Sequence, residues 1–275
     1  MAVDDQSRRE RSGGSEMIGP TTIKKIAREN GVPPTTVERD YVQNCFLRSL
    51  YSRSDSLVFK GGTSIRKAFI ENYRFSDDLD FTSLKKVDQE KINTLMRDIK
   101  EEMREENEVF FEDKTGIKDV ATGWKLNLWY TSILSQNTDI RLTLDITDSE
   151  KEKIVTPVEE NPLIHPYPDV CKIDLMTYSL KEITLEKLRA LCDRGWPRDL
   201  YDVYNLWPKI ERTDFDKLFY KKCNVRGVEP TVDSYMQKRE KIRSAWSKSL
   251  RHQLKEVPDF EICFQKVKGV LEELL

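Results

Sequence analysis

The sequence predicts an α/β domain followed by a helical region. In the first 150 residues, short segments rich in β-branched and aromatic residues alternate with segments whose apolar residues recur at helical spacing. After about residue 175 the patterns are helical, with stops at Gly195–Pro197, Gly227–Pro230 and Pro258. A chain of 275 residues is long enough for one large domain or two modest ones.

The N-terminal part divides into a tail and a pair of helices. Residues 1–20 open with a charged stretch that lacks the apolar segment of a secretory signal, and we expect a disordered tail. Residues 21–55 predict helices that are broken at Gly31–Pro34, with Thr36 as a candidate cap of the second helix. The pair superficially resembles a helix-turn-helix, but the second helix lacks the basic face that reading DNA requires.

Residues 56–175 contain the predicted α/β core, and residues 176–275 the predicted helical C-terminal domain. Within the core we expect strands over 56–60, 78–82, 124–133 and 139–147, helices over 63–72 and about 87–106, and a proline-rich connector over 161–169.

The composition excludes some classes of protein. Hydrophobic residues make up 38% and charged residues 34%, as in soluble globular proteins. The chain has no run of 18 apolar residues, which argues against a membrane-bound protein. Its five cysteines are scattered without a CxxC pair, which favours reduced thiols in the cytoplasm over a zinc site.

Two glycines mark the first candidate for ligand binding. Gly61 and Gly62 follow a predicted strand and open a helix, where backbone N–H groups and the helix dipole favour a phosphate. The hydroxyls of Thr63 and Ser64 lie beside this point. A Gly-Gly pair also suits any tight turn, so this motif alone is weak.

The acidic segment after it strengthens the case. Strand alternation places Asp78 and Asp80 on one face, about 7 Å apart, where they can share a hard divalent cation. The alternation also directs Leu79 and Phe81 to the core. A charged edge strand is the alternative, but solvated charges rarely interrupt such an apolar run. We therefore expect Mg²⁺ or Mn²⁺ here.

Asp145 is the candidate for a third metal ligand. It alternates with Thr143 and Arg141 along a predicted strand, opposite the apolar Leu142 and Leu144. The pattern fits equally well with an exposed residue on a half-buried strand.

The segment 186–202 supplies candidate phosphate-binding cations. Lys187 and Arg194 are seven residues apart, nearly on one helix face, and both suit a triphosphate. Asp199 and Asp202 lie three apart on the next predicted helix and are expected to pair with Lys187 and Arg198. A salt-bridged helix pair without a ligand remains an alternative.

A basic stretch lies near the C-terminus. Between Lys217 and Lys255 there are eleven Lys and Arg against three Asp and Glu, a local balance of +8, in a chain whose net charge is −2. Such a stretch indicates either a nucleic-acid surface or a solvated helix face.

Two blocks together carry a family resemblance. Lys60–Ser64 with Arg74–Phe81, and Glu186–Arg194 with Pro197–Tyr204, resemble the AbiEii/AbiGii nucleotidyltransferase toxins in order and spacing. The resemblance extends over about residues 20–270. It implies a polymerase beta-like nucleotidyltransferase domain with a mixed sheet, an NTP substrate and a cognate antitoxin. Related MenT toxins transfer nucleotides to the acceptor end of tRNA.

The resemblance also implies roles for single residues. It places nucleotide phosphate at Gly61, Gly62 and Thr63 and metal at Asp78 and Asp80, and it makes Lys187 an essential phosphate-contacting residue and Asp202 an essential acid. Asp145 matches less sharply. Ser64–Ile65 replaces the commoner pair of a small residue and Leu, a departure that leaves the chemistry intact.

Three functions remain open at this point. The first is transfer of a nucleotide from NTP to RNA, with the tRNA 3′ end as the expected acceptor. The second is transfer to a protein or small molecule, and the third is nucleotide binding without catalysis. The set of Asp78, Asp80 and Lys187 favours an enzyme, and the basic stretch favours RNA. A Ser-His-Asp hydrolase is disfavoured, because neither histidine lies in a nucleophile motif.

Overall fold

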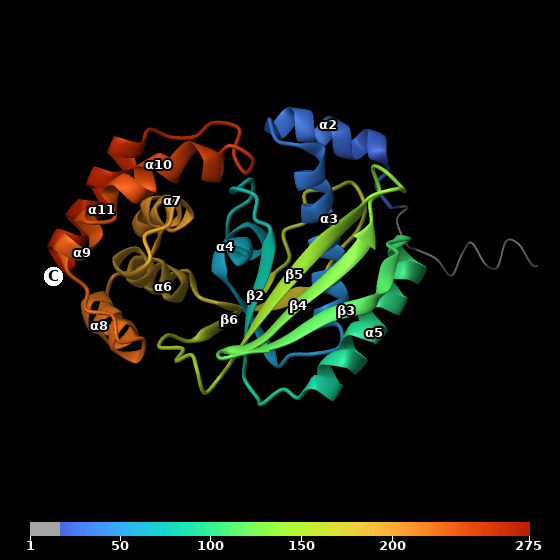
Figure 1. The fold of residues 1–275 in the computed structure, drawn as a ribbon, viewed down its shortest axis with the longest axis horizontal. Coiled ribbons are helices and arrows are strands. Elements are labelled where there is room, and N and C mark those ends of the chain that lie inside the picture. The colour runs from blue at the N-terminus through green and yellow to red at the C-terminus, as the bar shows by residue number, and fades with distance from the viewer. Residues whose placement is uncertain (1–16) are drawn as a thin grey trace, which may run out of the picture.

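A mixed sheet and a bundle of helices make up the molecule. The computed structural model describes residues 17–275, so most of the predicted disordered tail lies outside the described residues. Figure 1 shows the sheet with the N-terminal helices behind it and the C-terminal helices beside it. The predicted order, an α/β part followed by a helical part, is confirmed.

The sheet has seven strands in the order β3-β4-β5-β2-β1-β7-β6. β2 lies at its centre, antiparallel to β1 and parallel to β5. The strands are β1 (Leu57–Lys60), β2 (Asp78–Ser83), β3 (Phe111–Val120), β4 (Gly123–Thr131), β5 (Asp139–Asp148), β6 (Val158–Pro162) and β7 (Asp174–Tyr178).

Helices flank the sheet on one face and follow it in the chain. The N-terminal and sheet-associated helices are α2 (Pro20–Asn30), α3 (Pro34–Tyr51), α4 (Gly61–Ser64), the π-helical turn η1 (Ile65–Phe69) and α5 (Gln89–Asn107). The C-terminal helices are α6 (Leu180–Asp193), α7 (Pro197–Leu206), the 3₁₀ turn η2 (Trp207–Lys209), α8 (Phe215–Val225), α9 (Val232–Met236), α10 (Arg239–Leu250) and α11 (Phe260–Leu274).

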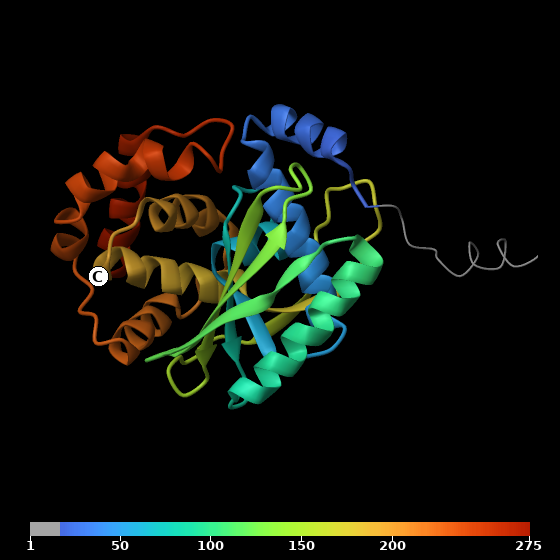
Figure 2. The same ribbon diagram turned by 45° about the vertical axis from the view of Figure 1, so that its right-hand side comes forward.

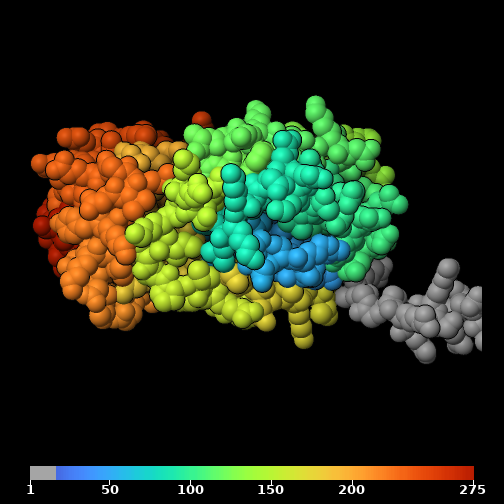
Figure 3. Space-filling view, turned by 90° about the horizontal axis from the view of Figure 1, so that it is seen from below, coloured from blue at the N-terminus to red at the C-terminus, as the bar shows by residue number. Residues whose placement is uncertain are grey.

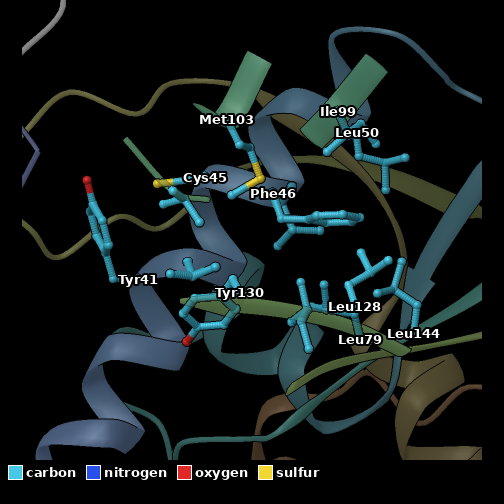
Figure 4. Packing of buried hydrophobic residues seen from close by; sticks show 14 of the residues in the cluster. Tyr41, Cys45, Phe46, Leu50, Leu79, Ile99, Met103, Leu128, Tyr130 and Leu144 are labelled. Carbon is cyan, nitrogen blue, oxygen red and sulfur yellow. The ribbon is translucent and has the colours of Figure 1, made fainter. Parts of the chain in front are cut away.

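The helix α3 forms the centre of the first core. It begins with Pro34, a residue that is favoured in the first turn of a helix, and 13 of its 18 residues are buried. A helix that is buried on nearly all sides has no free face to offer to a DNA groove, which argues against the helix-turn-helix interpretation. Figure 4 shows Phe46 of α3 and Met103 of α5 against Leu79, Leu128 and Leu144 of the sheet.

A second core holds the C-terminal helices together. Its buried residues run from Leu185 to Leu271 and include Phe219, Trp246 and Phe264. A smaller cluster, including Val58, Ile65 and Tyr178, joins the helices to the sheet. The C-terminal helices form a separate bundle in Figure 2, and Figure 3 shows the segment near residues 145–165 between the two parts.

Several predicted elements differ from the observed ones. The strands β3, β6 and β7 were not predicted, and β7 crosses the boundary placed between residues 175 and 176. β3 and β6 are edge strands with mostly exposed side chains, so they lack the apolar alternation of half-buried strands. The helix expected over 63–72 begins at Gly61 and ends at Phe69 with a π-helical turn.

All five cysteines are buried and free, as the prediction of reduced thiols requires. Within residues 17–275, every helix is too short or too polar to cross a membrane.

The core predicts a clear stability difference. Phe46 is fully buried, so Phe46→Ala removes apolar contacts and leaves a cavity that costs about 3–5 kcal/mol of unfolding free energy. Urea unfolding measures the change, with Leu84→Ala at a 43% exposed position as the control. Equal losses in the two variants would contradict this account of the core.

Candidate active site

The acidic residues meet at the centre of the sheet. Asp80 on β2 lies opposite Lys60 on β1 and opposite Asp145 on β5, and Asp78 lies opposite Thr143. Strand alternation therefore places all of these side chains on the face away from α3. On the other face, Leu79 and Phe81 are fully buried, as expected from the sequence.

Burial and mutual repulsion raise the affinity of these acids for protons. Burial is the main cause that raises the pKa of Asp80 to about 6; Asp78 and Asp145 add to it, and Lys60 and Lys187 oppose it. Burial and the neighbouring Asp77 and Asp145 also raise the pKa of Asp78. A cation bound between these carboxylates would relieve that repulsion, so their chemistry fits a hard divalent metal.

Asp145 is engaged with a lysine in this arrangement. Its Oδ2 lies 3.3 Å from Nζ of Lys125, in the cross-strand pair of β4 and β5. Among the residues that the structure describes, no three His, Cys, Asp or Glu side chains form a ready metal-binding group. Asp78 and Asp80 are better placed than Asp145 to be metal ligands. Asp145 can join them only if its contact with Lys125 breaks.

Gly61 packs directly on Asp80. Its φ is +77°, a conformation that side chains disfavour, and a Cβ there would lie 2.4 Å from Oδ2 of Asp80. The preceding residue provides no side-chain cap for α4, so the backbone N–H groups of this turn remain available to a ligand. The position and conformation of Gly61 fit the predicted phosphate-binding turn.

The hydroxyls predicted to bind nucleotide are used within the turn. Thr63 donates its hydroxyl to the carbonyl of Asp78, and Ser64 donates its own to the carbonyl of Gly61 at 2.9 Å. Both side chains are fully buried. The structure therefore favours a role for Thr63 and Ser64 in holding the glycine turn against β2, and leaves ligand contact to the backbone.

Gly62 faces a buried arginine. A Cβ at Gly62 would lie 2.3 Å from Nη2 of Arg74. Arg74 donates through Nε and Nη2 to the two carboxylate oxygens of Asp202, at 2.7 and 2.6 Å. Tyr73 donates its hydroxyl to the same carboxylate at 3.1 Å.

These bonds define the environment of Asp202, the predicted essential acid. The residue is fully buried, and Lys187 lies 3.0 Å from its Oδ2. The surrounding cations lower its pKa against the effect of burial. An enclosed, fully paired carboxylate is suited to positioning Arg74 and Lys187, and the structure favours that role over direct contact with substrate.

Lys187 connects this buried pair to the second acid of α7. Its Nζ lies 2.9 Å from Oδ1 of Asp199. The other carboxylate oxygen, Oδ2, accepts a hydrogen bond from Nε of Arg194 at 3.1 Å. Asp199 and Asp202 thus both pair with Lys187 as predicted, whereas Arg198 lies 3.8 Å from Asp77 instead. Lys187 influences the Asp80 carboxylate electrostatically, so it lies on the site side of α6.

Arg194 occupies a more open position. Its guanidinium stacks 3.9 Å from the ring centre of Trp196, and 42% of its side chain is exposed. It is therefore the more accessible of the two predicted phosphate-binding cations.

Two residues of the site were not predicted from the sequence. Lys60 is buried beside Asp80 and pairs with Glu152, and Arg74 holds Asp202. Lys60 ends the first strand next to Gly61, and that adjacency was the available signal. Arg74 stands four residues before Asp78, but its partner is 128 positions away, so spacing gave no clue.

Part of the basic stretch is paired with acids or with backbone in the structure. Arg239 and Arg243 share Glu261 at 2.5 and 3.6 Å, and Lys241 donates to the carbonyl of Arg194 at 2.6 Å. Lys222 is buried between Glu182 and Glu186. The local charge of +8 thus overstates the free positive charge of this surface.

The mixed sheet, the paired acids on its central strand and the glycine turn against them define a nucleotidyltransferase. The family model described as "Nucleotidyl transferase AbiEii toxin, Type IV TA system" matches residues 46–267. The chain belongs to this family of nucleotidyltransferase toxins, in which each toxin has a cognate antitoxin.

Solved structures share the fold. MenT4, a nucleotidyltransferase toxin from Mycobacterium tuberculosis, is 18% identical with a TM-score of 0.64, covering 94% of this chain and 89% of its own. A protein from H. pylori assigned as a nucleotidyltransferase is 16% identical with a TM-score of 0.58, covering 88% and 96%. A search of curated protein sequences finds no match.

The raised pKa of Asp80 predicts a gain in stability on neutralising it. Between pH 3.8 and about pH 6, Asp80 retains its proton in the folded protein, whereas the unfolded chain has released it. This group therefore lowers stability as the pH rises through that window, and its cost is greatest above about 6. At pH 8 without divalent cations, Asp80→Asn should be more stable by about 1–3 kcal/mol.

Urea unfolding at pH 8 and pH 4 tests this, because the difference should nearly vanish at pH 4. The exposed Asp139→Asn is the matched control. A less stable Asp80→Asn at pH 8 would show that the carboxylate is well compensated in the folded state.

Proposed function

We propose that this toxin transfers a nucleotide from an NTP to the 3′ end of RNA in the cytoplasm, with tRNA as the expected acceptor. A divalent cation, Mg²⁺ or Mn²⁺, is proposed to be held by Asp78 and Asp80. The observation that supports this most is the placement of both acids on one face of β2, with Gly61 packed on Asp80 and Asp145 in register beside it.

Each part of the site has a role in this proposal. A divalent cation held by Asp78 and Asp80 would supply positive charge to the phosphates and lower the pKa of the attacking hydroxyl. The uncapped N–H groups after Lys60 bind phosphate, because they carry partial positive charge at a helix start. Lys187 and Arg194 compensate the charge on the phosphates, and Arg74 positions Lys187 through Asp202. Asp145 is the proposed third ligand.

The acceptor is inferred from family membership. Membership of a toxin family fits an acceptor that the host needs for growth, and tRNA is such a molecule. A protein or small-molecule acceptor, or binding without transfer, would give a different result in the assay below.

Removing either acid should abolish transfer. The purified protein is incubated with total tRNA and each α-labelled NTP in turn, with Mg²⁺ or with EDTA. We expect labelled tRNA only with the metal, and a loss on the order of 10³-fold or more in Asp78→Ala and Asp80→Ala, because a ligand to the catalytic metal is lost.

Asp174→Ala, at an exposed position at the start of β7, is the control and should retain activity. Incorporation into tRNA by Asp80→Ala near the wild-type rate would overturn the metal assignment. Label in a protein or small molecule would redirect the acceptor.

Lys187 and Lys181 allow a matched comparison on one helix. Their side chains are similarly exposed, at 13% and 18%, but Lys181 pairs with Glu211 away from the acids. Lys187→Ala should reduce kcat/KM on the order of 10²-fold or more, because a preorganised charge is removed from the phosphates, while Lys181→Ala should change it by less than about twofold. Small and equal effects would show that Lys187 is only a buried ion-pair partner.

A further inference from the structure

The uncovered face of β3, β4 and β5 extends outward from the acidic site. Figure 1 shows these strands in front of α3, so their other face is open. The cross-strand pairs on this face are Trp129 with Arg141, Asn127 with Thr143, and Lys125 with Asp145. On β3, Lys118 pairs with Lys125 and Gly116 with Asn127. We call these residues the open sheet face.

The open sheet face carries three cations, Lys118, Lys125 and Arg141, against two acids. Asp145 pairs with Lys125, and Asp139 lies opposite Thr131, two residues before Arg141 on the same face. Lys118 and Arg141 are exposed, and 44% of the Lys125 side chain is exposed. Arg141 is four residues from Asp145 along β5, which corresponds to about 13 Å. Two exposed cations, Lys118 and Arg141, therefore lie on the face that leads to the proposed third metal ligand.

An aromatic ring lies across this surface. A Cβ on Gly116 would approach Cη2 and Cζ3 of Trp129 to 3.2 and 3.3 Å, so the glycine lets the indole lie over the backbone of β3. Trp129 is only partly buried, whereas Leu128 and Tyr130, its neighbours on the core face, are fully buried. A half-exposed indole between basic side chains suits stacking with a nucleobase.

We propose that the open sheet face binds the single-stranded 3′ end of the acceptor RNA. Lys118, Lys125 and Arg141 contact the phosphates, and Trp129 stacks on a base. This inference rests on the proposed transfer to RNA. It is supported by the positive charge of the face and by its continuity with Asp145.

The open sheet face is a better candidate than the C-terminal helices for this role. Three cations of α10 are engaged: Arg239 and Arg243 pair with Glu261, and Lys241 donates to a backbone carbonyl. An ion-paired arginine must give up its partner before it can bind a phosphate, which lowers the net gain. The acceptor surface therefore moves from residues 217–255, where the sequence alone placed it, to the sheet.

Direct RNA binding tests this inference separately from catalysis. The full chain is titrated, without NTP, into a fluorescein-labelled RNA hairpin with a four-nucleotide 3′ overhang and into the same hairpin with a blunt end. We expect tighter binding of the overhang. Lys118→Glu with Arg141→Glu should raise its Kd about tenfold or more, and should reduce the slope of log Kd against log salt by about two.

Trp129 gives a second measurement on the same surface. Trp129→Ala should weaken overhang binding about tenfold with little effect on the blunt hairpin, and Trp129→Phe should retain most of the binding. Lys24→Glu with Lys25→Glu, an equal charge change at exposed positions of α2, is the control and should bind as the wild type.

Two outcomes would overturn the inference. One is an unchanged overhang Kd in Lys118→Glu with Arg141→Glu; the other is loss of binding only when Lys238, Arg239, Lys241 and Arg243 are changed to Glu. If the wild type labels RNA while the sheet variants bind normally, the inference fails but the proposed function stands. If the wild type neither binds nor labels RNA, the proposed function itself fails.

Discussion

The buried pairing of Arg74 with Asp202 is the constraint that organises this site. A guanidinium is planar and presents its donors in a fixed fork, so a bidentate pair sets both the distance and the angle between the segments that carry it. Arg74 precedes β2, Asp202 lies on α7, and Gly62 leaves the space that Arg74 occupies. Nη1 of Arg74 also donates to Gln253 at 3.0 Å, beyond α10. One side chain thus fixes the glycine turn, the acidic strand and the C-terminal helices relative to one another. Replacing a buried ion pair with hydrophobic residues of similar volume often leaves the stability of a protein unchanged. We therefore attribute to this pair the geometry that it sets rather than a gain in stability.

Like charges are held together a short distance from this satisfied pair. The register of β2 with β5 brings Asp80 beside Asp145, and burial adds to the cost of ionising Asp80. Lys60 offsets part of that cost from β1, but it is also paired with Glu152. Holding these acids together lowers the stability of the folded protein, and the two hydrophobic cores offset that cost. The arrangement favours the binding of a cation. Groups of like charges that lower stability in this way are typical of functional sites.

Strand alternation and helical spacing allowed the α/β order, the core role of Leu79 and the shared face of Asp78 and Asp80 to be predicted from the sequence. Asp199 and Asp202 were expected to pair with Lys187 and Arg198, whereas the fold brings both acids to Lys187 and Arg198 to Asp77. The edge strand β3 was missed because its outward side chains carry no apolar alternation. Buried roles were missed for a different reason. Thr63 and Ser64 look like ligand-binding hydroxyls beside two glycines. Only their bonds to the carbonyls of Asp78 and Gly61, respectively, show that the turn uses them internally.

The two basic regions show why a local charge count along the sequence differs from the charge that a surface presents. Residues 217–255 are rich in cations along the chain, but the fold brings Glu182, Glu186 and Glu261 from other helices to meet them. On the sheet the opposite happens. Lys118 and Arg141 come from separate strands and form no cluster in the sequence, yet the register places both on the face of Trp129 with exposed side chains. Lys125 lies on the same face and is paired with Asp145. Electrostatic attraction for a polyanion depends on charges that remain uncompensated on one face, so the strand register is a better guide to that surface than the sequence composition.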